Sequence, residues 1–512
     1  MFNLQKGIAR SGLIILLLIV AAVVVLFLLP TPKPGQVAVA ATGTKATEDA
    51  NCLSVPANFS MPAVLAADPP ASLWKGWSYG NAITLSATPS AALVDQPVTI
   101  RVSGLKPNEP VTLRANMQDY QHRTWRAAAT FLADNSGKVD VTRDAPKYGS
   151  YSGEHAVGLV WSMLPENVKD PQETLYDPSL EDQSYPLTIE ALAGNRVLAQ
   201  TTLTRYLRTP GVTKTLVTAD SLTGVLYIPS TPGQHPAIVV LGGSEGGWIS
   251  SSPEAALLAS HGYTALALAY FQGFQSFDPR LAGLPKMLVN IPLEYFAKAA
   301  DWLRQQPGVD PNHIGIIGWS KGAEAALITA ATFPKDFQAV IAFMPSSVVW
   351  SGIEYGPGPI SSSWTLDGKP LPWVNPVINP AMFSSGKPLA FLDSYRSGLK
   401  DTVTVDKALI PVEQIRGPLL LVSATDDQIW PSPVMARQIM QRLASHHHAY
   451  EDESLCYAGA GHDIQAPYRP TNAGVVAVPG GSFAFGGNPL AYAFADQDAW
   501  SKVLTFLRKS LQ

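Results

Sequence analysis

Hydrophobic residues follow three different patterns along the chain. The first is an apolar run over 11–29 that contains no charged residue. Between about 82 and 208, apolar and polar residues alternate in short runs such as 99–103 and 111–115, with turn-forming residues between them. From about 224 onward, short apolar runs alternate with longer stretches of helical period. Strict alternation is typical of half-buried strands, whereas fully apolar runs between helices indicate a parallel sheet covered on both faces.

The first pattern predicts a membrane anchor or signal segment over 1–30. About twenty helical residues at roughly 1.5 Å each match the ~30 Å hydrocarbon core of a bilayer. Lys6 and Arg10 precede the run, and the positive-inside rule keeps such an N-terminus in the cytoplasm. The competing interpretation is a signal peptide cleaved after Ala38 and Ala40, which form an A-x-A sequence. We therefore expect an extracytoplasmic catalytic domain, either anchored by this helix (periplasmic or cell-surface) or secreted.

The second pattern predicts an all-β domain over 81–210, preceded by a linker over 31–80. The linker is rich in Pro, Ala and Thr and shows little periodicity. Short alternating runs at roughly ten-residue spacing, separated by turn signals, are typical of an all-β sandwich.

The third pattern predicts an α/β catalytic domain over 211–512. Its expected buried strands are 237–241, 264–269, 314–318, 339–343 and 419–423. A long irregular segment over about 345–415 interrupts the alternation and carries Trp350, Trp364 and Trp373. Segments of this length in a compact domain usually form lids or binding loops. We expect a lid insertion here, with aromatic packing onto the core as the alternative.

Composition narrows the class of protein. Hydrophobic residues make up 46% of the chain and charged residues 15%, which supplies a large core and excludes disorder as the main state. The net charge of −4 gives no electrostatic basis for binding nucleic acid. Cys52 and Cys456 are too few for a disulfide framework or a four-cysteine zinc site, and they lie far apart in sequence. We expect both cysteines to be free.

The sequence over 318–322 (GWSKG) fits G-x-S-x-G, the turn that presents a nucleophilic serine in α/β-hydrolases. It follows the expected strand 314–318 and precedes an alanine-rich helix over 323–332. Glycines suit the pattern because side chains at those positions of so sharp a turn would clash. Ser320 is therefore the predicted nucleophile, and a glycine-rich turn with an incidental serine is the alternative.

A serine hydroxyl needs a base to take its proton and a carboxylate to orient that base. His462 lies in a glycine-rich loop after the expected strand 453–457 and is the predicted base. The carboxylate is expected directly after the strand 419–423, where Asp426 and Asp427 both qualify. Sequence spacing alone does not choose between them.

The oxyanion that forms during acyl transfer needs two backbone N–H donors. One is expected from Lys321, the residue after the nucleophile, and the other from Gly243 or Ser244 in the glycine-rich loop 242–247. Each such donor typically contributes about 2.7–4 kcal/mol of transition-state stabilisation. Trp319 and Trp350 are the predicted substrate contacts.

No metal or organic cofactor is predicted, since the proposed chemistry needs none. The loop 242–247 lacks the G-x-G-x-x-G pattern of dinucleotide-binding sites. The three adjacent histidines at 446–448 follow a helix expected over 433–443. We expect these histidines to be solvated or to interact with the C-terminal end of that helix, rather than to bind a metal.

From about residue 83 onward, the chain resembles the acyl-CoA thioesterase and bile acid-CoA:amino acid N-acyltransferase family. The matching motifs occur in the family's order: 157–163 (VGLVWSM), 241–247 (LGGSEGG), 318–324 (GWSKGAE), 426–430 (DDQIW), 458–462 (AGAGH) and 495–500 (ADQDAW). The resemblance implies an immunoglobulin-like sandwich followed by an α/β-hydrolase domain. It also implies a triad of Ser320, Asp427 and His462, because the family's acid aligns with the second aspartate of the pair.

In this family, members with a serine nucleophile are typically thioesterases, whereas the amino acid-conjugating branch uses cysteine. The resemblance therefore implies hydrolysis of an acyl-CoA-type thioester to a free carboxylic acid through an acyl-enzyme. The predicted anchor favours an alternative, an extracytoplasmic carboxylesterase or dienelactone-hydrolase-like enzyme acting on non-CoA esters. A further alternative, an inactive membrane-tethered binding module, is disfavoured because all candidate catalytic residues are present. The sequence makes no prediction about the oligomeric state.

Overall fold

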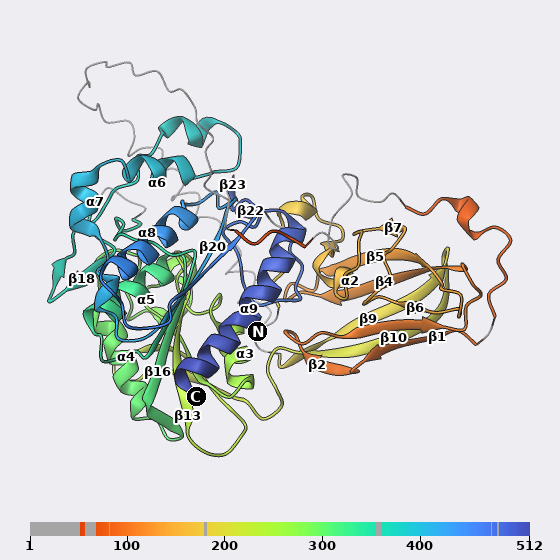
Figure 1. Ribbon diagram of the computed structural model, residues 1–512, viewed down its shortest axis with the longest axis horizontal. Helices are drawn as coiled ribbons and strands as arrows, with labels where there is room; N and C mark the ends of the chain where they lie inside the picture. The colour runs from red at the N-terminus through yellow and green to blue at the C-terminus, as the bar shows by residue number, and fades with distance from the viewer. Residues whose placement is uncertain are drawn as a thin grey trace.

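The computed structural model describes residues 52–56, 68–80, 82–178, 182–354, 360–472, 474–478 and 481–512. They form a β domain, which contains β1 to β10, beside an α/β domain, which contains β11 to α9 (Figure 1). The predicted anchor over 1–30 and most of the predicted linker lie outside these residues. Among the residues that are described, no helix has the length and apolar character needed to cross a bilayer.

The β domain consists of two sheets around one core. The smaller sheet has the order β1-β3-β6 and the larger has the order β2-β10-β9-β4-β5-β7, with β8 paired to β5. The strands are β1 (Thr84–Thr88), β2 (Ala91–Leu93), β3 (Thr99–Ser103), β4 (Pro110–Gln118), β5 (Thr124–Leu132), β6 (Val139–Asp140), β7 (Tyr148–Gly149), β8 (Leu164–Pro165), β9 (Ser184–Ala193) and β10 (Arg196–Tyr206). The alternating runs predicted at 99–103 and 111–115 are strands β3 and part of β4.

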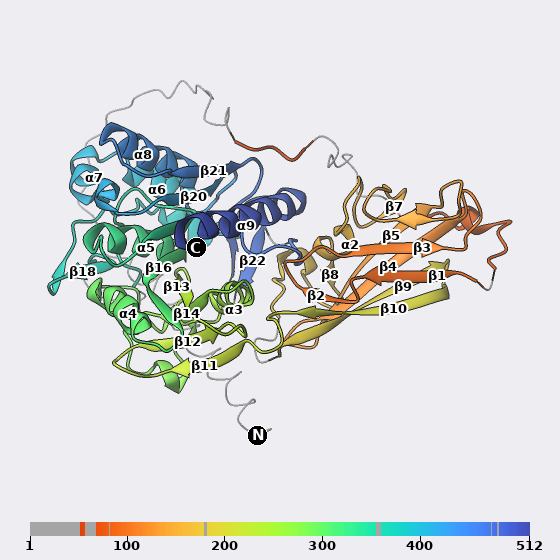
Figure 2. The ribbon, with the colours of Figure 1, turned by 60° about the horizontal axis from the view of Figure 1, so that its bottom comes forward.

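Alternation along these strands places apolar side chains between the two sheets. In β4, for example, Leu113 and Ala115 are fully buried while Arg114 between them is partly exposed. Trp125 and Phe131 of β5 fill the same core, together with residues of the short helix α2 (Gly158–Trp161). Figure 2 shows this domain as a separate layered unit.

The α/β domain is built on an eight-stranded sheet. Its order is β11-β12-β14-β13-β16-β17-β20-β21, and only the pairs β11–β12 and β12–β14 are antiparallel. The strands are β11 (Thr213–Val217), β12 (Thr223–Ile228), β13 (His235–Leu241), β14 (Thr264–Ala269), β16 (Val309–Trp319), β17 (Ala339–Phe343), β20 (Leu419–Ala424) and β21 (Glu453–Tyr457). This arrangement is the α/β-hydrolase fold that the sequence predicts.

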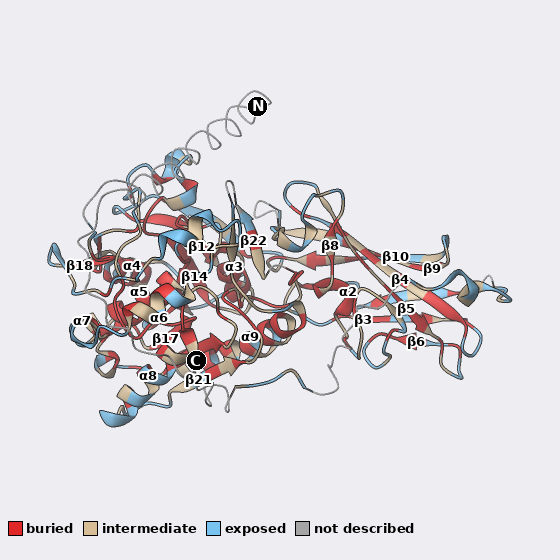
Figure 3. Ribbon diagram, turned by 90° about the horizontal axis from the view of Figure 1, so that it is seen from above, coloured by how far each residue is buried: buried red, intermediate tan, exposed pale blue. Residues whose placement is uncertain are grey.

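Helices cover both faces of this sheet. One face packs against α3 (Ser252–Ser260) and α9 (Pro489–Leu511), and the other against α4 (Glu294–Arg304), α5 (Lys321–Thr332) and α8 (Ser432–Ser445). Because both faces are covered, all six residues of β14 are buried. The buried residues in Figure 3 accordingly follow the sheet and the inner sides of its helices.

The predicted lid region is an insertion between β17 and β20 with short elements of its own. They are β18 (Trp364–Leu366), β19 (Lys369–Pro370), η6 (Pro380–Ser384), α6 (Leu392–Gly398), α7 (Thr402–Ala408) and η7 (Val412–Gln414). β18 pairs with β15 (Ile291–Pro292), which precedes α4. Trp350 and Trp364 are both 0% exposed, so this part of the insertion packs into the body of the domain.

The two domains are joined by buried polar contacts. Asp95 of the β domain accepts hydrogen bonds from Trp500 Nε1 of α9 at 2.9 Å and from His261 Nε2 at 2.5 Å. On another side of the interface, Asn472 Nδ2 donates to the backbone oxygen of Pro171 at 2.7 Å. These bonds fix how the β domain sits against α9 and the loop that follows β21.

The two cysteines form a disulfide. The prediction that both are free is therefore wrong. Cys52 and Cys456 are 404 residues apart in sequence, yet their Cα atoms lie 4.6 Å apart. The segment around Leu53 runs alongside β21, where Leu53 N donates to Cys456 O at 2.7 Å and Ala458 N donates to Leu53 O at 2.9 Å. Part of the predicted linker is therefore an extra strand-like segment at the edge of the catalytic sheet.

We expect the double variant Cys52→Ser/Cys456→Ser to lose about 2–4 kcal/mol of unfolding free energy, because the cross-link restricts the unfolded chain. Urea unfolding should show a lower midpoint for the variant. Reductant should shift the wild-type midpoint toward that of the variant and leave the variant unchanged. A wild-type midpoint that does not respond to reductant would contradict the prediction.

Candidate active site

Ser320 occupies a sharp turn between β16 and α5. Its φ of 54° and ψ of −119° are a strained conformation for a residue with a side chain. A Cβ on Gly318 would lie 2.1 Å from the oxygen of Gly322, and a Cβ on Gly322 would lie 2.2 Å from the oxygen of Gly242. Both positions therefore require glycine, which is the physical reason for the G-x-S-x-G pattern.

The structure brings Ser320, His462 and Asp427 together at one edge of the sheet. His462 Nε2 lies 2.9 Å from Ser320 Oγ, and His462 Nδ1 lies 2.9 Å from each carboxylate oxygen of Asp427. The three residues follow β16, β20 and β21, which run parallel, so the carboxyl ends of these strands meet at the same edge. Asp427 and His462 are buried, at 2% and 8% exposure.

The carboxylate of Asp427 is held by several donors besides His462. Ile429 N and Trp430 N donate to Oδ1 at 3.0 and 3.1 Å, and Ser432 Oγ donates to Oδ2 at 2.6 Å. Hydrogen bonds of this kind stabilise a charged carboxylate in a buried position. They also fix the plane of the carboxylate against the imidazole.

Asp426 has a different set of partners. It accepts from Gln428 Nε2 at 2.7 Å and from Gly487 N at 2.8 Å. It therefore ties the loop after β20 to the glycines that precede α9. Sequence spacing does not choose between these two aspartates, but their contacts differ. Asp427 contacts His462, whereas the side-chain hydrogen bonds of Asp426 are to Gln428 and Gly487.

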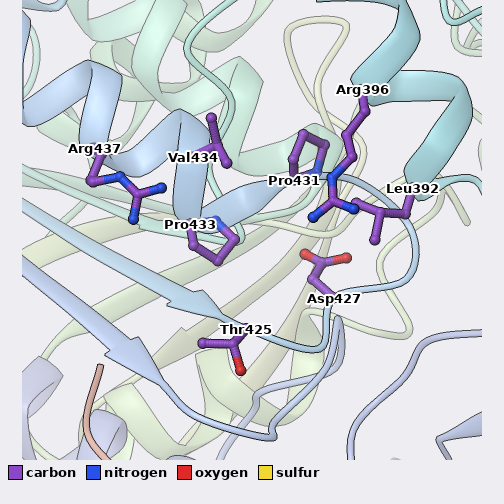
Figure 4. Close-up of a pocket in the computed structure, with 8 residues that line it drawn as sticks. All are labelled: Leu392, Arg396, Thr425, Asp427, Pro431, Pro433, Val434 and Arg437. Carbon is purple, nitrogen blue, oxygen red and sulfur yellow. The ribbon is translucent and has the colours of Figure 1, made fainter. Parts of the chain in front are cut away.

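A small cavity is lined in part by Asp427. Its volume is about 20 Å³, and Figure 4 shows Arg396, Thr425 and Pro431 around the carboxylate. A cavity of this size has room for about one water molecule. It is too small for a substrate group.

The predicted oxyanion donors differ in their contacts. Lys321 is the first residue of α5, so its N–H has no acceptor within the helix. The Gly243 N–H donates to Glu245 Oε1 at 2.8 Å. The prediction that Gly243 supplies a free donor is therefore corrected, because its hydrogen is already used. Ser244, the other predicted donor, is exposed.

The two predicted substrate contacts, Trp319 and Trp350, have internal partners. Trp319 stacks on Phe343 with ring centroids 4.7 Å apart, and its Nε1 donates to Ile464 O at 2.9 Å. Trp350 is fully buried, and its Nε1 donates to Ser346 Oγ at 2.9 Å. The indole of Trp350 is thus part of the core, which disagrees with its predicted contact with substrate.

A buried ion pair under the nucleophile turn was not predicted from the sequence. Lys321 Nζ lies 2.7 Å from Glu324 Oε2, and both side chains are almost fully buried. Glu324 Oε1 also accepts from Trp350 N at 3.0 Å and from Trp364 Nε1 at 2.7 Å. Burial raises the pKa of Glu324 and lowers that of Lys321. Glu324 thereby links α5 to the insertion.

A cluster of ionisable residues holds the segment that follows His462 in the sequence. Arg469 Nη2 donates to the backbone oxygen of Asp463 at 2.8 Å and to its Oδ2 at 3.0 Å. Asp496 of α9 lies 3.7 Å from Arg469 Nε, and its Oδ1 accepts from Gln465 N. Burial raises the pKa of Asp496 to about 8. This cluster anchors the segment that follows His462.

We expect the stability of the protein to depend on pH through Asp496. Because its pKa is about 8 in the folded protein, against 3.8 for an exposed aspartate, the folded state keeps a proton that the unfolded chain has lost. This contribution to stability therefore falls as the pH rises from about 4 to 8, by roughly 1 kcal/mol per pH unit. The variant Asp496→Asn, which stays neutral, should show a flatter decline in urea midpoint between pH 5 and 8. Equal slopes for the two proteins would contradict this assignment.

The histidines at 446–448 do not converge on a common point where a metal ion could bind. His448 Nδ1 lies 2.7 Å from Asp452 Oδ2, and its Nε2 lies 2.9 Å from Ile415 O, while His446 and His447 are exposed. Over the described residues, no group of three or more metal-ligating side chains is found.

Three family models match the chain. "BAAT / Acyl-CoA thioester hydrolase C terminal" matches residues 291–512, and "Acyl-CoA thioester hydrolase/BAAT N-terminal region" matches residues 95–219. "Dienelactone hydrolase family" matches residues 222–356. The first two models cover both domains of the structure.

Curated relatives match along most of the chain. Mitochondrial acyl-coenzyme A thioesterase 2 of Mus musculus is 32% identical over 85% of this chain and 91% of its own length. Acyl-coenzyme A thioesterase 1 of Mus musculus is 33% identical over 84% of this chain and 97% of its own length. Among solved structures, dienelactone hydrolase from Anabaena variabilis is 16% identical, covers 59% of this chain and all of its own, and has a TM-score of 0.32.

The predicted extracytoplasmic, membrane-anchored location is corrected by these findings. The relatives that match over almost their full length include mitochondrial enzymes. In the described part of the chain, no helix could span a membrane.

Proposed function

This chain belongs to the acyl-CoA thioester hydrolase/BAAT family and is a thioester hydrolase, and from that membership we propose that it hydrolyses acyl-CoA to a free carboxylic acid and CoA. Ser320 is the nucleophile, His462 the general base and Asp427 the residue that orients the imidazole. The observation that carries the proposal is the Ser320–His462–Asp427 chain, with 2.9 Å between His462 and each neighbour.

In the first step, Ser320 Oγ adds to the thioester carbonyl carbon while its proton passes to His462 Nε2. The carbonyl electrons move to the oxygen, which becomes the oxyanion. The N–H groups of Lys321 and Ser244 donate to that oxygen. When the C–S bond breaks, sulfur keeps the electron pair and takes the proton from His462, which leaves an acyl group on Ser320.

In the second step, a water molecule adds to the acyl carbonyl carbon and gives its proton to His462. The bond between that carbon and Ser320 Oγ then breaks, and Oγ takes back the proton. The net reaction consumes one thioester and one water and releases one carboxylic acid and one thiol. The buried carboxylate of Asp427 stabilises the imidazolium in both steps.

A second candidate keeps the same residues and changes the leaving group. The dienelactone hydrolase family model matches residues 222–356, which include the glycine-rich loop and Ser320. An esterase that acts on oxygen esters would use the same triad. We therefore retain carboxylesterase activity on non-CoA esters as the alternative.

The two candidates are separated by the substrates of the purified full-length chain. It would be assayed with acyl-CoAs of increasing chain length and with p-nitrophenyl esters of the same acyl groups. The proposal expects a higher kcat/KM for acyl-CoA, with one CoA thiol released for each acid. Turnover of the p-nitrophenyl esters alone would favour the alternative, and no turnover of either class would refute both.

For the β domain we propose the immunoglobulin-like class that the family resemblance implies. Its two sheets around one core, to which residues of α2 contribute, support this class. No catalytic role is assigned to it.

A further inference from the structure

Tyr270 follows β14 directly and reaches the backbone of the glycine-rich loop 242–247. Its hydroxyl oxygen lies 2.8 Å from the carbonyl oxygen of Gly242 and 3.1 Å from that of Gly243. A phenol carries one proton, so it donates a hydrogen bond that two carbonyls share. One side chain thus fixes two successive peptide groups next to the nucleophile.

The orientation of these carbonyls also fixes the N–H groups of the same peptides. In a trans peptide the C=O and N–H point in opposite directions. With the Gly242 carbonyl turned to Tyr270, the Gly243 N–H points away from it and donates to Glu245. With the Gly243 carbonyl held in the same way, the Ser244 N–H points away from Tyr270. Among the described residues, this N–H meets no acceptor.

The loop lies directly against the nucleophile. A Cβ on Gly243 would be 3.3 Å from Ser320 Cβ and 3.3 Å from Trp319 O. Ser244, the next residue along the chain, is exposed. We propose that Tyr270 is a positioning residue that directs the Ser244 N–H toward the oxyanion formed at Ser320. This inference rests on the proposed acyl-transfer function.

The surroundings of Tyr270 suit this role. Its ring is buried and packs against Phe271, Phe296 and Trp364, with ring centroids 5.1, 5.3 and 6.0 Å away. Burial and the nearby carboxylate of Glu245 raise the pKa of Tyr270 well above its usual value. The hydroxyl therefore stays protonated, and remains a donor, at any pH used for an assay.

The test compares Tyr270→Phe with Tyr295→Phe. Each variant removes one phenol hydroxyl. That of Tyr295 is partly buried, donates to Ala269 O at 2.7 Å and accepts from Thr223 N at 3.1 Å, and among the described residues it makes no hydrogen bond to the loop 242–247. A purely structural role predicts similar effects of the two changes. Our proposal expects Tyr270→Phe to lower kcat by about 10- to 100-fold with KM within about twofold, since loss of a whole oxyanion donor costs about 10²–10³-fold. Tyr295→Phe should keep kcat within about twofold.

Comparing the affinities of two inhibitors separates a loss of oxyanion stabilisation from a general loss of folding, which would weaken the binding of both. A trifluoromethyl ketone analogue of acyl-CoA forms an oxyanion with a serine nucleophile, whereas a thioether analogue without a carbonyl does not. We expect Tyr270→Phe to weaken binding of the ketone by the same factor as kcat/KM and to leave binding of the thioether unchanged. Equal weakening of both, or a kcat equal to that of Tyr295→Phe, would overturn the inference.

Failure of the inference about Tyr270 can be distinguished from failure of the proposed function. If wild type shows no Ser320-dependent turnover, the function itself is wrong. If turnover depends on Ser320 but Tyr270→Phe behaves like its control, only the inference fails. Should Tyr270→Phe not fold, Ser244→Pro removes the N–H itself at an exposed position, and we expect at least a 100-fold lower kcat. Wild-type activity of that variant would also overturn the inference.

Discussion

Replacing Ser320 with alanine is expected to lower kcat for thioester hydrolysis by about 10⁵- to 10⁶-fold. The change removes the only atom that can form the acyl-enzyme, and losses of this size accompany removal of a serine nucleophile in triad enzymes. The proposed oxyanion donors, the N–H groups of Lys321 and Ser244, remain, so a small residual rate above that in water should persist. The measurement is release of CoA thiol at saturating acyl-CoA.

The variant should otherwise resemble wild type. Ser320 Oγ makes its described contact with His462, at 2.9 Å, so its removal leaves the turn between β16 and α5 in place. The melting temperature should stay within a few degrees of wild type. The double variant Ser320→Ala/His462→Ala should be no slower than the single one, because the two residues act as a unit. A Ser320→Ala protein with wild-type turnover would refute the mechanism.

Asp427→Asn is expected to reduce kcat by about 10⁴-fold, with a much smaller effect on KM. An amide has the size of the carboxylate but cannot stabilise an imidazolium, and it favours the wrong tautomer of the histidine. Asp427 accepts from His462 Nδ1 through both oxygens, so the substitution changes the atom that holds the ring.

The neighbouring aspartate provides the matched control. Asp426→Asn makes the same chemical change one residue away, where the partners are Gln428 and the N–H of Gly487. We expect this variant to lose some stability and to keep kcat within about tenfold of wild type. If Asp426→Asn proved the more damaging to kcat, the assignment of the acid would have to be reversed. The measurement is kcat of both variants and of wild type in the same acyl-CoA assay over the same pH series.

Much of the α/β domain could be predicted because its signals are local. The strand predicted over 264–269 coincides with β14, and the strand predicted over 453–457 coincides with β21. The G-x-S-x-G turn could be placed between a strand and a helix because glycine at Gly318 and Gly322 is a direct steric requirement. Strands and turns of this kind are specified by residues close together in the sequence, so the sequence alone suffices to predict them.

The features that the sequence did not reveal depend on contacts between distant segments. The pairing of Cys52 with Cys456 requires the segment after the N-terminus to lie along β21, which no local pattern indicates. The contact of Gly243 with Glu245 and the burial of Trp350 likewise arise only when loops from different strands meet. A tryptophan in a long insertion carries no local sign of whether it faces the core or the substrate.

The cross-link between Cys52 and Cys456 also determines how the protein comes apart. It closes a covalent ring that contains the whole β domain and most of the catalytic sheet. A single proteolytic cut anywhere between these two residues therefore yields two pieces that remain one molecule until the disulfide is reduced. On a non-reducing gel such a nicked protein would run as a single band, and its two fragments would separate only after a thiol is added.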